Sequence, residues 1–71
     1  MKLHYHQDTD SLYIGLNARR GADSREITEG LVVDFDAENH VVGIDIQHAS
    51  QMLDMQTLET ESFPATRTRI A

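Results

Sequence analysis

Residues 31–50 constrain the fold of this chain more than any other stretch. Apolar and polar side chains alternate on both sides of a polar break at residues 37–40, which is the pattern of two half-buried strands joined by a turn. The apolar side chains share one face only if odd positions of the first strand oppose even positions of the second, and one such register leaves a loop at residues 37–40. That register pairs Phe35 with Val42, Val33 with Ile44, and Leu31 with Ile46. The opposite face then carries Val32, Asp34, Val41, Gly43 and Asp45.

A second hairpin is predicted at the start of the chain. Residues 2–6 and 11–16 show the same alternation around a polar turn. Its register pairs Leu3 with Ile14 and Tyr5 with Leu12, and the opposite face holds His4, His6, Tyr13 and Gly15. An aromatic ring can cover the bare backbone of a glycine on a neighbouring strand, so we expect Tyr13 and Gly43 to pack together.

The connection between the two hairpins, residues 17–30, is polar and irregular. Ile27 is its one large apolar residue, and we expect a short edge strand at residues 24–28. Charged side chains around it would protect an exposed sheet edge from pairing with another chain. Gly30 can take positive φ cheaply and is expected in the turn that follows.

One helix is predicted after the strands. Met52, Met55 and Leu58 recur every three residues, which favours an amphipathic helix over residues 51–59. The Ser50 hydroxyl is expected to cap its first turn. The alternative is that these methionines are ordinary core residues.

These segments predict an α+β fold. The domain, residues 1–60, is a small antiparallel β-meander of about four strands, with a possible short fifth, followed by one C-terminal helix. Residues 61–71 contain Pro64 and lack periodicity, which predicts a flexible tail. The helix is expected to pack on the apolar side of the sheet. That side consists of Tyr5, Leu12, Ile14, Val33, Phe35, Ile44 and Ile46.

The chain is too small to bury a large core. A domain of this length buries only about 60% of the surface that its unfolded chain exposes. The sequence has two Phe, two Tyr, no Trp and no Cys, so no disulfide compensates. A short helix leaves part of the sheet uncovered, and we therefore expect a homodimer. The expected partner contacts are Tyr13, Val32, Val41, Met52 and Met55.

Charge and hydropathy narrow the class of partner. The formal net charge of −6 argues against binding to nucleic-acid phosphates and favours a basic protein partner. No apolar run approaches the roughly 18 residues of a membrane span, and the first residues lack a signal-peptide core. Together with the absence of cysteine, this predicts a cytoplasmic protein.

No catalytic motif or cofactor-binding motif is present, and we do not expect an enzyme. The predicted register makes Asp34 and Asp45 diagonal neighbours, too far apart for a catalytic carboxylate pair. The alternative function is a small-ligand or metal-binding protein that uses the acidic sheet face with His4 and His6. Two histidines are too few ligands for a metal site, so we do not predict one.

Several short motifs resemble a known bacterial family, the domain of unknown function 2283. They are Met1-Lys2, Tyr5, Asp10-Ser11-Leu12-Tyr13-Ile14, the stretch from Gly30 to Asp36, the stretch from Val41 to Ile46, and Ala49-Ser50. Asn39 stands where that family usually has glycine, which predicts a left-handed backbone there. His4 and His6 are not part of the pattern. Small acidic members of the family are similar in size to antitoxins, so the resemblance implies an antitoxin-like role toward a basic, toxin-like protein.

Overall fold

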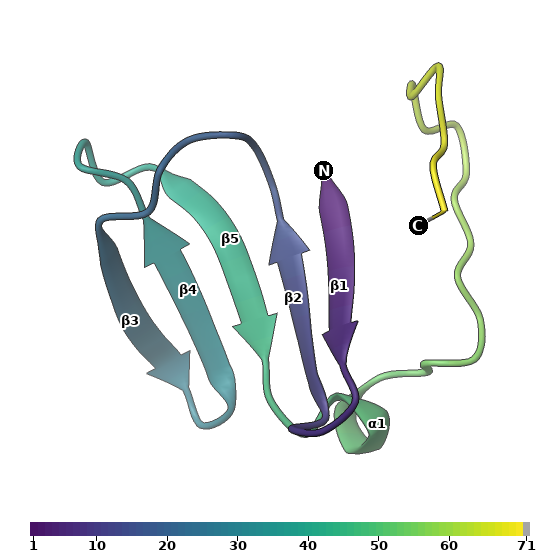
Figure 1. Ribbon diagram of the computed structural model, residues 1–71, viewed down its shortest axis with the longest axis horizontal. Helices are drawn as coiled ribbons and strands as arrows, with labels where there is room; N and C mark the ends of the chain where they lie inside the picture. Colours follow the sequence, from purple (N-terminus) through teal and green to yellow (C-terminus); the bar gives the residue numbers. More distant parts are fainter. Residues whose placement is uncertain (71) are drawn as a thin grey trace.

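The computed structural model describes residues 1–70 and shows an antiparallel sheet followed by a short helix (Figure 1). The strands are β1 (Lys2–His6), β2 (Ser11–Gly15), β3 (Asp23–Thr28), β4 (Leu31–Phe35) and β5 (Val41–Ile46), and the helix is α1 (Ala49–Met52). This is the small α+β fold that the sequence predicts. The possible fifth strand is present as β3.

The strand order is β1-β2-β5-β4-β3, which places β5 at the centre of the sheet. Strands β3, β4 and β5 form a meander, in which each strand pairs with the next. The hairpin of β1 and β2 joins this meander because β2 pairs with the free edge of β5. Both hairpins therefore contribute to one continuous sheet. Ile44 of β5 lies between Ile14 of β2 and Val33 of β4.

The predicted registers are confirmed at four of their five apolar pairs. Those four are Leu3 with Ile14, Tyr5 with Leu12, Leu31 with Ile46, and Val33 with Ile44. The fifth is wrong, because Phe35 pairs with Val41 instead of Val42 after a shift in register between Asp34 and Phe35. Such a bulge places two residues of one strand opposite one residue of the other.

Two turns have the left-handed backbone that the sequence indicates. Gly30 has φ +82°, between β3 and β4, and Asn39 has φ +67°, between β4 and β5. Asparagine tolerates this conformation better than most residues with a Cβ. The prediction at Asn39 is confirmed.

The predicted helix over residues 51–59 is wrong in length and position. The helix ends at Met52, because Leu53 is extended and the Asp54 carboxylate accepts the backbone N–H of Gln56 at 3.1 Å. So short a helix needs tertiary packing to persist, and local aspartate hydrogen bonds compete with it. Ser50 is not the N-cap. That position is His48, in left-handed conformation with φ 53°.

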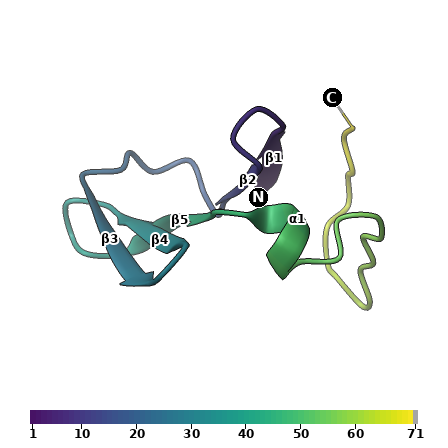
Figure 2. The ribbon, with the colours of Figure 1, turned by 90° about the horizontal axis from the view of Figure 1, so that it is seen from below.

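The helix does not cover the sheet. Figure 1 shows α1 beyond the ends of β1 and β2, and residues 53–70 running beyond β1, and Figure 2 shows that neither lies over β3, β4 or β5. Residues 53–70 form no helix or strand, and the expected tail over 61–71 includes residue 71, which lies outside the described residues. The expectation that a helix packs on the apolar side of the sheet is therefore wrong.

The surface of the chain is correspondingly large. An 8.0 kDa chain has an accessible surface of 6165 Å², whereas a compact monomer of that mass has about 4,450 Å². Its radius of gyration is 13.1 Å, against about 11 Å for a compact domain of this length. Among the described residues, the buried apolar side chains are Leu12, Val42 and Ala49. No helix in the described chain is long and apolar enough to cross a lipid bilayer.

Candidate functional site: two sheet faces of opposite character

Strand register divides the sheet into an apolar face and a polar face. The apolar face consists of Leu3, Tyr5, Leu12, Ile14, Leu31, Val33, Phe35, Val42, Ile44 and Ile46. The polar face carries His4, His6, Tyr13, Val32, Asp34 and Asp45. On the apolar face only Leu12 and Val42 are buried, and Leu3 and Tyr5 at its β1 edge are 45% and 41% exposed. The others are half-buried.

A hydrogen-bonded chain crosses the polar face from β3 to β2. Ser24 donates to one carboxylate oxygen of Asp34 at 2.6 Å, and the Tyr13 hydroxyl donates to the other at 3.2 Å. The Tyr13 ring reaches Asp34 by lying over Gly43, where an added Cβ would overlap the hydroxyl. The predicted packing of Tyr13 on Gly43 is confirmed. Burial, followed by the Asp34 carboxylate, raises the pKa of Tyr13.

Asp45 has a different environment on the same face. It pairs with Tyr13 on one side and Val32 on the other, and one of its carboxylate oxygens is buried with no hydrogen-bond partner among the described residues. Asp34 lies opposite Gly43, so the two aspartates are diagonal neighbours, as the sequence predicts. An open hollow of about 520 Å³ adjoins Asp45. It is lined by His6, Thr9, Ser11, Tyr13, Asp45, Gln47 and His48.

The two histidines of β1 lie together, but they do not complete a metal site. The rings of His4 and His6 have centroids 4.2 Å apart. No cluster of three or more His, Cys, Asp or Glu side chains within residues 1–70 is arranged to hold a metal ion. A pair of ligands on an exposed strand is a weak site for any divalent cation.

Asp10 ties the first hairpin to the start of α1. Its carboxylate accepts hydrogen bonds from the hydroxyls of Tyr5 and Ser50, each at 2.7 Å, and from the backbone N–H of Ser50 at 3.1 Å. Its carbonyl accepts the Ala49 N–H at 2.8 Å. The contact between Asp10 and the start of α1 is not predicted from the sequence, although Asp10 and Ala49-Ser50 are both in the family pattern.

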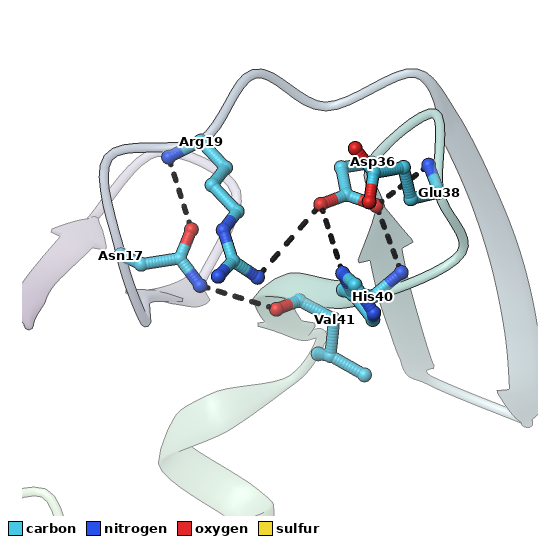
Figure 3. A network of polar contacts seen from close by, with 6 residues as sticks. All are labelled: Asn17, Arg19, Asp36, Glu38, His40 and Val41. Carbon is cyan, nitrogen blue, oxygen red and sulfur yellow. Dashed lines mark hydrogen bonds and ion pairs between the residues drawn. The ribbon is translucent and has the colours of Figure 1, made fainter.

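Asp36 connects the segment before β3 to the turn between β4 and β5, and Figure 3 shows its contacts. One carboxylate oxygen accepts the backbone N–H groups of Glu38 and His40, at 2.9 and 2.8 Å. The other lies 3.9 Å from the Arg19 guanidinium and 3.6 Å from the His40 imidazole. Asn17 donates to the Val41 carbonyl at 3.3 Å, so the connection before β3 is held against the turn before β5.

The sequence model of a family described as a protein of unknown function (DUF2283) matches residues 2–50. The chain belongs to this family. No curated protein and no solved structure matches the chain. In this DUF2283 chain, several polar residues of the family pattern make their side-chain hydrogen bonds within the fold. They are Tyr5, Asp10, Tyr13, Asp34, Asp36 and Ser50.

The contacts expected from the sequence do not form one surface on the DUF2283 sheet. Tyr13 and Val32 flank Asp45 on the polar face and are half-buried. Val41 lies at the bulge and is 40% exposed, whereas Met52 and Met55 lie beyond the end of β5. The apolar strand side chains instead gather on the opposite face of the sheet.

We predict that this DUF2283 domain loses stability in acid. The hydrogen bonds from Ser50 and Tyr5 hold the pKa of Asp10 below its usual 3.8, and those from the His40 and Glu38 amides lower the pKa of Asp36. A carboxylate with a lowered pKa stabilises the fold above its unfolded pKa, and this contribution disappears as pH falls through the folded pKa. Urea midpoints measured from pH 6 to pH 2 should therefore decrease below about pH 4. In Asp10→Asn the urea midpoint should decrease less as the pH falls. A dependence on pH identical to that of the wild type would contradict the stabilising role of the Asp10 carboxylate.

Proposed function

We propose that this chain is a non-enzymatic protein-interaction domain of the cytoplasm, and that its apolar face packs against another polypeptide. One observation supports this: neither the helix nor the C-terminal segment covers that face. A sheet with one apolar face is stable only when that face is buried against a second layer. An apolar face that the chain itself leaves uncovered is characteristic of a binding surface.

Charge indicates the class of a further partner, distinct from the polypeptide on the apolar face. A chain of net charge −6 attracts basic proteins and repels nucleic-acid phosphates. We include in the proposal an antitoxin-like role, in which the chain binds a basic, toxin-like protein. The hydrogen bonds of Asp34, Asp10 and Asp36 are made within the fold, which supports a structural role for these carboxylates over a catalytic one.

A hydrophobic fluorescent dye tests the proposal on the isolated full chain. After dilution to a concentration at which sedimentation shows a monomer, the dye should bind strongly and fluoresce. Ile14→Gln, on the apolar face, should reduce the fluorescence, whereas Met52→Gln should leave it unchanged, because Met52 is exposed away from the sheet. A monomer that binds no dye would contradict the proposal, since its apolar face would then be inaccessible.

A further inference from the structure

We propose that the polypeptide covering the apolar face is a second copy of this chain, with the two sheets packed face to face about a two-fold axis near β5. This inference rests on the proposed function and names its partner. It places the interface on the side of the sheet opposite to Tyr13 and Val32. Surface area, charge and register each support it.

The surplus surface of the chain is larger than the area that one partner buries in a dimer interface. The accessible surface of 6165 Å² exceeds that of a compact monomer of this mass by about 1,700 Å². A stable interface buries about 800 Å² on each partner. Part of the surplus belongs to residues 53–70, which are exposed throughout, and an interface of ordinary size on the apolar face would account for about half of the whole.

The charge distribution permits a second copy to pack on this face in particular. Two acidic chains repel wherever their carboxylates meet, and the polar face carries Asp34 and Asp45. The strand residues on the apolar face include one acid and one base, Asp23 and Arg25 at the β3 edge, and these lie 3.7 Å apart as an ion pair. The Arg25 guanidinium also lies over the Phe35 ring, 3.7 Å from its centroid. This face is thus close to neutral, and two copies can approach there without like-charge repulsion.

The strand register places a row of apolar side chains at the centre of the sheet, where it can pack against the same row of a second copy. Ile14, Ile44 and Val33 lie side by side across β2, β5 and β4, at the centre of the sheet. In an aligned sandwich two sheets pack about 10 Å apart with their strands about 30° apart, so side chains from the two faces interdigitate. A two-fold axis through the central strand brings this row against its own copy, because an isologous interface uses the same patch twice.

Sedimentation of the full chain at micromolar concentration tests the inference. The wild type should sediment as a dimer. The matched variants are Val33→Lys and Val32→Lys, since these two half-buried valines are adjacent in β4 on opposite faces. Val33→Lys should raise the dimer Kd by about 100-fold or more, because it places an unpaired charge in the interface. Val32→Lys should leave the dimer intact, and equal effects of the two variants would overturn the inference.

A cysteine variant keeps the test decisive if Val33→Lys does not fold. The chain has no cysteine, so Ile44→Cys introduces a single thiol at the centre of the apolar face. A short bis-maleimide should link two Ile44→Cys chains and should not link two Val32→Cys chains. A monomeric wild type that still binds the dye would overturn the second copy as partner and leave the proposed function standing. A monomer that binds no dye would overturn both.

Discussion

Replacing Leu12 with alanine is expected to lower the free energy of unfolding by about 2–5 kcal/mol, the range for truncating a buried leucine. Leu12 is 8% exposed, and it lies between Tyr5 of β1 and Ile46 of β5. Its removal opens a cavity where the first hairpin joins the rest of the sheet. Urea unfolding at one fixed protein concentration measures the loss, since the stability of a dimer depends on concentration.

Leu58→Ala is the matched control. Leu58 is 78% exposed in the segment after α1, so its truncation should change the free energy of unfolding by no more than about 0.5 kcal/mol. A loss in Leu12→Ala as small as the loss in Leu58→Ala would show that the β1–β2 hairpin does not depend on this side chain.

Gly43→Ala is expected to destabilise the fold by about 1–3 kcal/mol, as overpacking does in a well-packed site. A Cβ at Gly43 would overlap the Tyr13 hydroxyl and force the ring off the strand. The hydrogen bond from Tyr13 to Asp34 would then be lost. Spectroscopic titration of tyrosine should also show the raised pKa of Tyr13 moving back toward 10.0, because both the burial and the Asp34 contact that raise it are removed.

A double-mutant cycle separates this clash from a general intolerance of alanine. In a Tyr13→Ala background, Gly43→Ala should cost almost nothing, so the two substitutions should be strongly non-additive. Gly15→Ala is the control on the paired glycine, where a Cβ would meet its nearest atom at an ordinary 3.6 Å. Additive losses in the cycle would contradict the assigned contact.

The sequence predicts the hairpins of this fold because the alternation of apolar and polar residues shows which side of each strand faces the apolar side of the sheet. A one-residue slip would turn every apolar side chain of a strand to the wrong face, so alternation excludes every register in which Leu3 and Ile14, or Val33 and Ile44, lie on opposite faces. The same parity places Tyr13 and Gly43 on one face of the sheet, and their packing also needs β2 to lie beside β5. The bulge at Phe35 is not encoded in alternation, since it changes the pairing only beyond Asp34.

The remaining features depend on contacts that periodicity does not report. Alternation within two hairpins does not specify which strands meet between them, and here β2 pairs with β5. The three-residue repeat of Met52, Met55 and Leu58 resembles a helix stripe, but a helix of that length forms only against a surface. The Ser50 hydroxyl bonds to Asp10, 40 residues away, a long-range partner that its helix-capping propensity does not indicate.

Protection of the central apolar side chains from solvent tests the main claim most directly. Methyl-detected NMR of the full chain at micromolar concentration, with a soluble paramagnetic agent, measures the access of solvent to individual side chains. We predict that the methyl groups of Ile14, Val33 and Ile44 are shielded, while the Met52 methyl group is strongly broadened. Broadening of Ile14, Val33 and Ile44 as strong as that of Met52 would contradict the proposed dimer, because the apolar face of the isolated chain would then be open to water.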